Sequence, residues 1–299
     1  MKRLIIIIFF LVIWSSPCYC QEEKSPVPKI GLSSIATVNQ GNSYITFPAD
    51  IGNLEPLWFE ADIVPNFLIR KSKNARLMGV ITPQIIIRMY QEESQPVRTP
   101  SYMPQIAVYY SLKETKQKKT YTLFGKFAHH SNGQDGNFYL PDGEINLISG
   151  NFSTNFFDFG VIKTHYNPKF NAIQFFSTSL EIHPPGWSNE ELEGLYSMVR
   201  WHGGFSFYKI PLGKERAGHT RARISLKGDV MWMFGDINDW SQVSPDRLNL
   251  GLTFYFHPGF LEDIGLFVQV YHGMDYYNIY FNHQISVLRF GIMTDILRF

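Results

Sequence analysis

Apolar and polar residues alternate along several segments that have the length of a membrane-spanning strand. In one segment the apolar positions are Ala222, Ile224, Leu226, Gly228, Val230 and Trp232, and the positions between them are Arg221, Arg223, Ser225, Lys227 and Asp229. Side chains of a strand point alternately to its two faces, so this segment has one apolar and one strongly polar face. A soluble β-sandwich would bury the apolar face but would seldom carry so many charges on the other. The pattern favours an all-β, antiparallel transmembrane β-barrel, with lipid outside and a hydrogen-bonded polar interior.

Eleven candidate strands follow from this alternation. They lie near residues 55–70, 76–90, 103–113, 119–131, 153–166, 171–183, 195–209, 219–234, 246–257, 263–272 and 284–297. One more strand is expected in the region 28–48. Because single-chain bacterial barrels have an even number of strands, the chain is predicted to form twelve.

Residues 1–20 are predicted to be a secretory signal that is removed. A basic start is followed by an unbroken apolar run from Leu4 to Trp14 and by the small-x-small ending from Cys18 to Cys20. The apolar run is too short to span a bilayer as a helix, which needs about 20 residues. Lipid modification of Cys18 or Cys20 is the weaker alternative, since neither follows a small residue. Both cysteines lie in the removed segment, so no disulfide is expected in the mature chain.

Composition and charge narrow the classes of protein further. Aromatic residues make up 16% and charged residues 18% of the chain, yet no apolar stretch after the signal is long enough for a membrane-spanning helix. The formal net charge is +1, so no broad electrostatic field suggests a nucleic-acid partner. Residues 21–50 are expected to form a segment at the periplasmic rim with a possible first strand, and residues 51–299 the barrel. A terminal Phe299 after the last strand is typical of outer-membrane barrels.

The motif that carries chemistry is His129-His130-Ser131-Asn132-Gly133, at the end of a predicted strand. Strand alternation puts His129 and Ser131 on one face, which is mostly apolar, and His130 on the other. An imidazole that takes the hydroxyl proton turns a serine into a nucleophile. The apolar surround suggests a substrate that arrives from a lipid phase. His-x-Ser pairs are common, so the spacing alone does not establish catalysis. His130 is interpreted as a hydrogen-bonded residue of the barrel interior.

Three separated stretches, taken together, resemble bacterial outer-membrane phospholipase A, the phospholipase A1 family. They are the motif at 129–133, the stretch from Glu92 to Arg98 followed by Tyr102 to Gln105, and the stretch from Val268 to Tyr271 with Phe281 and Asn282 before the closing Phe299. The matches follow the family's order and cover most of the mature chain. The resemblance implies an outer-membrane enzyme that hydrolyses acyl esters of phospholipids and lysophospholipids. It would be a carboxylic ester hydrolase of the phospholipase A1/A2 type with a serine nucleophile.

The resemblance also implies the members of the catalytic site. Ser131 is the nucleophile, His129 the base, and Asn155 the position that matches the family's asparagine on the strand after the catalytic loop. Strand pairing agrees, because antiparallel strands on either side of the loop would bring Asn155 near His129. Its amide oxygen would then accept the imidazole N–H and fix the tautomer. Asn146 and Asn151 in the loop are the alternatives.

A calcium ion is implied by the resemblance as well. In the family a backbone amide at the motif glycine, here Gly133, stabilises the oxyanion with help from water on bound calcium. The resemblance nominates the Ser94 hydroxyl and the Gln134 carbonyl as ligands, and calcium prefers such oxygens. The sequence departs from the family at Gln134, where an arginine is usual. The loop from Ser131 to Asn155 is also much longer than the family's.

The longer loop leaves some of the implied ligands open. Either Ser149 or Asn151 replaces the family's second serine contact. The loop also brings Asp135, Asp142 and Glu144, which either bind calcium differently or are solvated loop charges, and the second interpretation is preferred.

Regulation by a reversible homodimer is implied too, with the calcium site completed across the interface. Gln84, inside the apolar run from Val80 to Ile87, is a candidate polar contact at that interface, with a lumen position as the alternative. Two other functions remain. A passive or transport barrel predicts a wide lumen. A lipid A deacylase shares a His-x-Ser-Asn motif, but those barrels are much shorter and lack the stretch from Glu92 to Arg98.

Overall fold

A computed structural model describes residues 30–94, 96–112, 119–210, 222–261 and 264–294 of the chain. The predicted signal segment 1–20 and the closing Phe299 lie outside these residues, as do parts of four expected strands. No helix within the described ranges is long and apolar enough to cross a membrane.

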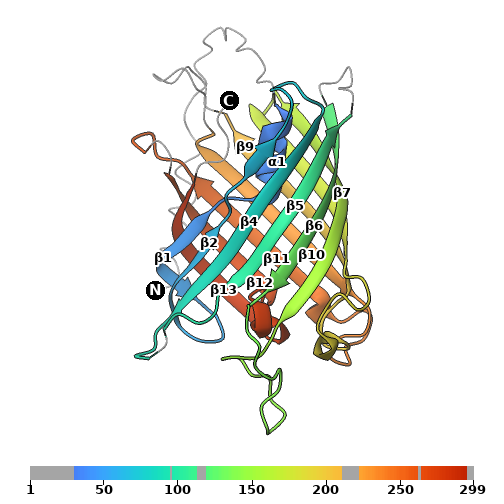
Figure 1. Ribbon diagram of the computed structural model, residues 1–299. Helices are drawn as coiled ribbons and strands as arrows, with labels where there is room; N and C mark the ends of the chain where they lie inside the picture. Colours follow the sequence, from blue (N-terminus) through green and yellow to red (C-terminus); the bar gives the residue numbers. More distant parts are fainter. Residues whose placement is uncertain (1–29, 95, 113–118, 211–221, 262–263, 295–299) are drawn as a thin grey trace.

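The described residues form one antiparallel sheet that closes on itself (Figure 1). Its strands are β1 (Tyr44–Ile51), β2 (Leu57–Ile63), β3 (Phe67–Ile69), β4 (Leu77–Tyr90), β5 (Ser101–Ser111), β6 (Lys119–Ser131), β7 (Ser153–Asn167), β8 (Ala172–Ile182), β9 (Val199–Lys209), β10 (Ile224–Phe234), β11 (Leu248–Phe256), β12 (Ile264–Met274) and β13 (Gln284–Thr294). From β4 onwards each strand pairs with the next, β13 pairs with β1, β1 with β2, and β2 with β4. The short β3 is an addition beside β4, so the barrel itself has twelve strands, which confirms the predicted fold class.

Two of the strand predictions were wrong in detail. The segment 55–70 forms β2 and β3 rather than one strand, because Pro65 between them has no backbone N–H to donate to the ladder. The strand expected within 28–48 starts only at Tyr44, and the residues before it form the helix α1 (Leu32–Gln40). Apolar residues at Leu32, Ile35 and Ala36 follow the helical spacing, which explains the helix.

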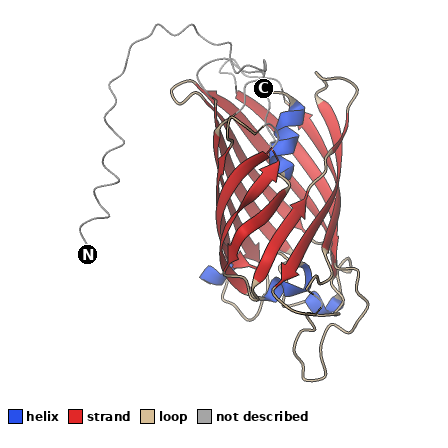
Figure 2. Cartoon of the chain, turned by 90° about the vertical axis from the view of Figure 1, so that its left-hand side faces the viewer, coloured by secondary structure: helices blue, strands red, loops and turns tan. Residues whose placement is uncertain are grey.

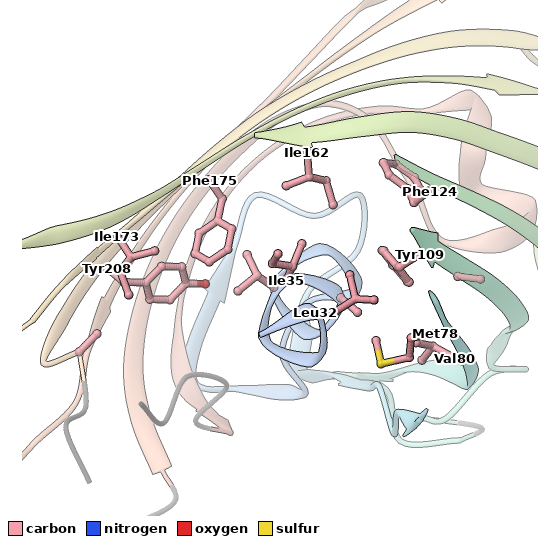
Figure 3. Close-up of a cluster of buried hydrophobic side chains, with 14 of the residues drawn as sticks. Leu32, Ile35, Met78, Val80, Tyr109, Phe124, Ile162, Ile173, Phe175 and Tyr208 are labelled. Atoms are coloured by element: carbon pink, nitrogen blue, oxygen red, sulfur yellow. The ribbon is translucent and has the colours of Figure 1, made fainter. Parts of the chain in front are cut away.

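The helix α1 lies inside one end of the barrel (Figure 2). Its apolar side chains, among them Leu32 and Ile35, pack against inward-facing residues of the surrounding strands (Figure 3). Those residues include Met78, Val80, Tyr109, Phe124, Ile162, Ile173, Phe175 and Tyr208. The expected rim segment is therefore a plug in the lumen over residues 32–40, and its apolar core stabilises that end of the barrel.

The wall has the alternation that the sequence predicts. On β11 the outward residues Leu250, Leu252, Phe254 and Phe256 are 43 to 49% exposed, whereas Asn249 and Thr253 are buried. Such an apolar outer surface suits the hydrocarbon core of a membrane.

Buried ion pairs fill part of the interior. The Arg88 guanidinium contacts the carboxylates of Glu60 and Asp275, both at 2.7 Å. Arg289 contacts Asp50 at 3.2 Å and Glu60 at 3.4 Å. Charges in a low-dielectric interior persist only when they are paired in this way.

The two ends of the barrel differ in their connections. Long connections gather at the lower end in Figure 1, including residues 132–152, 183–198 and 235–247. Three 3₁₀ helices lie in the connections at this end, η1 (Glu190–Leu192), η2 (Pro245–Arg247) and η3 (Asn278–Asn282). Outer-membrane barrels have long extracellular loops and short periplasmic turns. The long loops therefore mark the extracellular end, and α1 lies at the periplasmic end.

Candidate active site

The pairing of β6 with β7 brings two of the predicted site residues together. In the antiparallel register His129 lies directly opposite Asn155, and Ser131 opposite Ser153. His129 Nδ1 and Asn155 Oδ1 are 3.0 Å apart. The side chains of His129, Ser131 and Asn155 lie on the outer surface near the extracellular end, and all three are half-buried.

A third group determines which way the Asn155 amide points. Asn155 Nδ2 donates to the backbone carbonyl of Trp187 at 2.8 Å. A carbonyl oxygen only accepts, so the amide nitrogen must face Trp187 and the amide oxygen must face His129. The oxygen accepts from His129, so Nδ1 carries the ring proton. In the neutral ring, Nε2 is then an acceptor on the face that His129 shares with Ser131.

Ser131 is the last residue of β6, where the wall ends and the long loop begins. On the neighbouring strand β5, Ser131 pairs with Tyr102, which is 38% exposed on the outer face. The hydroxyl therefore belongs to a lipid-facing surface at the membrane boundary. This position agrees with a substrate that reaches the site from the lipid.

The turn after Ser131 presents a backbone amide. Gly133 is exposed and has a φ of 66°, a left-handed conformation that favours glycine. Within the described part of the chain no backbone acceptor pairs with the Gly133 N–H. An amide that is exposed and unpaired beside a nucleophile is suited to bind a developing oxyanion.

Asn132 holds this turn in place, a role that the sequence analysis did not assign. Its side chain is buried, with Oδ1 accepting from the N–H groups of Gln134 at 3.2 Å and Phe152 at 3.0 Å. Its Nδ2 donates to the Gly150 carbonyl at 2.7 Å. Asparagine before glycine at a strand end is a common turn signal, so Asn132-Gly133 in the motif already indicates a turn held by the asparagine side chain.

An aromatic cluster adjoins the site on the outer surface. The rings of Phe127 and Phe157 are 5.3 Å apart, and Trp187 packs on both, at 6.2 Å from Phe127 and 5.8 Å from Phe157. Trp187 is distant in sequence, so no pattern in the sequence could assign it to the site. Its ring makes the surface next to His129 and Asn155 strongly apolar.

The two segments nominated for calcium are linked through Thr99. The Gln134 side-chain amide donates to the Thr99 hydroxyl. The Thr99 carbonyl in turn accepts from Tyr277 Oη at 3.0 Å and Asn278 Nδ2 at 3.2 Å. Thr99, five residues after the exposed Ser94, is thus bound to the residue that follows the motif 129–133.

Arg98 anchors the same segment on its other side. It pairs with Glu55 at 2.5 Å and with Glu92 at 2.7 Å, and its guanidinium stacks over the Tyr90 ring at 4.4 Å. Burial lowers the pKa of Arg98, but the Glu55 carboxylate and the Tyr280 hydroxyl outweigh it and hold that pKa above its ordinary value.

The acidic residues of the long loop are exposed and form no metal cluster. Asp135, Asp142 and Glu144 are all exposed, and Asp142 Oδ1 accepts from the Glu144 N–H at 3.1 Å as in an ordinary turn. Across the described ranges, no group of three or more His, Cys, Asp or Glu residues is arranged to hold a metal ion. Their arrangement supports the interpretation as solvated loop charges.

Gln84 and His130 both face the interior. Gln84 donates to the Asp62 carboxylate at 2.9 Å and accepts from Gln105 at 2.9 Å, so its interpretation as a dimer contact was wrong. Its position on the inward face of β4 rules out a contact across the outer wall. His130 is buried, with Nε2 2.5 Å from the Ser101 hydroxyl.

Comparison with known proteins gives a likeness of structure only. No protein-family model matches the sequence, and no curated protein matches it either. Among solved structures, outer membrane phospholipase A from Escherichia coli superposes with a TM-score of 0.61 at 14% identity, over 90% of this chain and all of that one. The barrel has the fold of outer-membrane phospholipase A.

Two further phospholipase A structures support this likeness. The dimer from Salmonella typhi with bound calcium has a TM-score of 0.58 at 13% identity, covering 86% of this chain and 91% of its own. An active-site mutant of the E. coli phospholipase, with alanine in place of an asparagine, has the same TM-score and identity and covers 93% and 96% of the two chains. The phospholipase A fold and the apolar outer wall place the chain in a bacterial outer membrane.

Proposed function

We propose that this protein hydrolyses acyl esters of phospholipids and lysophospholipids in the outer membrane. The observation that carries the proposal is the oriented pair of His129 and Asn155, beside Ser131 on the lipid-facing surface. Both the shared phospholipase A fold and the three matching stretches of sequence support this substrate class. The reaction is that of a phospholipase A1/A2, a carboxylic ester hydrolase with a serine nucleophile.

The chemistry follows from the donors and acceptors of the site. His129 Nε2 accepts the Ser131 proton while Oγ attacks the ester carbonyl, forming a tetrahedral oxyanion. The imidazolium that results keeps its Nδ1–H on Asn155 Oδ1, which stabilises the new charge. His129 then returns the proton to the leaving alcohol. Water, activated by the same imidazole, releases the fatty acid from the acyl-enzyme.

The stabilisation of the oxyanion is assigned to the Gly133 N–H, which would donate a hydrogen bond to it. This amide is exposed, and Asn132 fixes the turn that presents it. Donors that are already oriented toward the developing charge cost no rearrangement during the reaction.

We propose that the site also uses calcium, with the Ser94 hydroxyl and the Gln134 carbonyl as ligands. The donor set fits this ion because both groups are hard oxygens, and the hydrogen bond from Gln134 to Thr99 keeps their segments together. Bound calcium supplies positive charge that stabilises the oxyanion. The neighbour from Salmonella typhi is a dimer with bound calcium, which supports a reversible homodimer whose interface completes the calcium site here.

The alternative functions fit the structure less well. A passive or transport barrel predicts a wide lumen, whereas α1 and the buried pairs of Arg88 and Arg289 occupy this one. The phospholipase A fold over nine-tenths of the chain favours phospholipid over lipid A as substrate.

The test is an ester-hydrolysis assay of the purified, folded barrel on mixed micelles of detergent and phospholipid. We expect release of fatty acid by the wild type with calcium and no release by Ser131→Ala. Equal activity of Ser131→Ala would overturn the assignment of the nucleophile. An inactive wild type that binds phospholipid would favour one of the alternative functions.

A further inference from the structure

The orientation of Asn155 depends on a turn outside the catalytic motif. Trp187, whose carbonyl accepts from Asn155 Nδ2, lies in the connection between β8 and β9. The same carbonyl also accepts from the Asn155 backbone N–H at 3.0 Å. Any movement of this turn would therefore move the acceptor that directs the amide oxygen toward His129.

Thr154 fastens the turn to β7. Thr154 forms an antiparallel bridge with Ser188, and the Asn189 N–H donates to the Ser153 carbonyl at 2.9 Å. The turn is thus held against the start of β7 by one β-bridge and its neighbouring backbone hydrogen bonds. The side chain of Thr154, on the inward face, adds two contacts at 2.6 Å, from Oγ1 to Ser188 Oγ and to His183 Nδ1.

For a neutral His183 ring, the direction of each hydrogen bond in this series follows from its partners. The Glu181 carboxylate, 2.9 Å from His183 Nε2, only accepts, so Nε2 carries a proton. Burial lowers the pKa of His183, which favours the neutral ring and leaves Nδ1 as an acceptor. The Thr154 hydroxyl then donates to His183 Nδ1 and accepts from the Ser188 hydroxyl.

Replacing Thr154 by valine would remove the hydroxyl that links Ser188 to His183 and would change the side-chain volume little. His183 is buried and would lose the donor to Nδ1, while Ser188 would lose its acceptor. A buried acceptor left without a partner is costly, so the turn is expected to shift. Its Trp187 carbonyl would no longer hold the Asn155 amide in one orientation.

We propose that Thr154 is a positioning residue of the active site, which acts through the Ser188 and His183 contacts on the turn that orients Asn155. This proposal rests on the proposed ester hydrolysis, because it concerns the same site. It adds a residue on the inward face of the barrel to a site that lies on the outward face.

The test is a double-mutant cycle between Thr154→Val and Asn155→Ala, assayed on the full chain in phospholipid mixed micelles. Loss of one hydrogen bond should lower kcat roughly three- to tenfold in Thr154→Val with KM unchanged. In the Asn155→Ala background the same change should have no further effect, since the residue it positions is absent. Thr154→Ser, which keeps the hydroxyl, should restore kcat.

Thr164→Val is the matched control. Thr164 is a buried threonine further along the inward face of β7, and its hydroxyl has no partner within the described residues. This variant should keep the wild-type kcat. Equal losses from Thr154→Val with and without Asn155 would overturn the positioning role and indicate general destabilisation. Full activity in both Asn155→Ala and Ser131→Ala would instead overturn the assignment of this catalytic site, and an inactive wild type would overturn the proposed function itself.

Discussion

On both faces of the wall around β6 and β7 a hydroxyl residue lies beside a histidine, but the two environments differ. Outward, Ser131 and His129 face lipid, with Asn155 bound to His129 at 3.0 Å. Inward, Ser101 contacts His130 at 2.5 Å, and Thr154 contacts His183 at 2.6 Å.

The inward groups have the shorter hydrogen bonds, yet they are not accessible to substrate. His130 and His183 are buried, and Ser101 and Glu181 already occupy their Nε2 atoms. On the outer face His129 is half-buried, and its Nδ1 is occupied by Asn155. A serine beside a histidine can therefore act on a substrate only where the second ring nitrogen and the hydroxyl are accessible.

The strongest test of this comparison replaces the two neighbouring histidines in turn. His129→Ala should lower the hydrolysis rate by a factor on the order of 10⁶, as removal of the base does in serine hydrolases, and the double variant with Ser131→Ala should be little worse. His130→Ala should keep much of the activity. Rates on mixed micelles decide this, with circular dichroism to check that each barrel is folded. Equal losses for both histidines would mean that the two faces are not distinct in function.

Much of this arrangement could be predicted from the sequence because strands alternate strictly. The alternation predicted eleven strands, the outward face of His129 and Ser131, and the inward face of His130, and the even strand number of such barrels predicted the twelfth strand. Asn155 followed from the resemblance together with antiparallel pairing across the loop. These inferences need only local pattern and nearest-neighbour strands.

Other features were missed for identifiable physical reasons. For Gln84 the lumen, which was the alternative, is the observed position. The preference for the outer wall was wrong because the run from Val80 to Ile87 carries apolar residues on both faces, although Arg88 on the same alternation marks the inward face. The helix α1 was missed because a single short helix inside a barrel has no counterpart in the strand pattern. Trp187 and His183 join the site only through the connection after β8, and no local pattern contains a contact of that kind.

The second test removes calcium, which is proposed to act on the outward face alone. Chelation should reduce hydrolysis by about 10²- to 10³-fold, comparable to the loss of one oxyanion donor. The barrel should remain folded, because the buried ion pairs of Arg88 and Arg289 do not involve the calcium segments. Fatty-acid release and circular dichroism, with and without chelator, measure both effects. Activity that is indifferent to chelation would contradict the calcium assignment.

The third test concerns the group that orients His129. Asn155→Ala removes an acceptor for the imidazolium, a hydrogen bond worth about 1.5–3 kcal/mol, so kcat should fall roughly 10- to 150-fold. The loss should be much smaller than that of His129→Ala, because Asn155 exchanges no proton. A loss as large as that of His129→Ala, measured as kcat under saturating substrate, would show that Asn155 has a larger role than orientation.

The smallest effect on activity is expected from the inward serine. Ser101→Ala leaves His130 Nε2 buried without its partner, which should destabilise the barrel by about 1–3 kcal/mol. Hydrolysis should stay near the wild-type rate, because the outward face keeps Ser131, His129 and Asn155. Denaturant unfolding followed by tryptophan fluorescence, beside the micelle assay, separates the two effects. Normal stability with lost hydrolysis would mean that the catalytic serine is Ser101 on the inward face, which would contradict the assignment of the outward face.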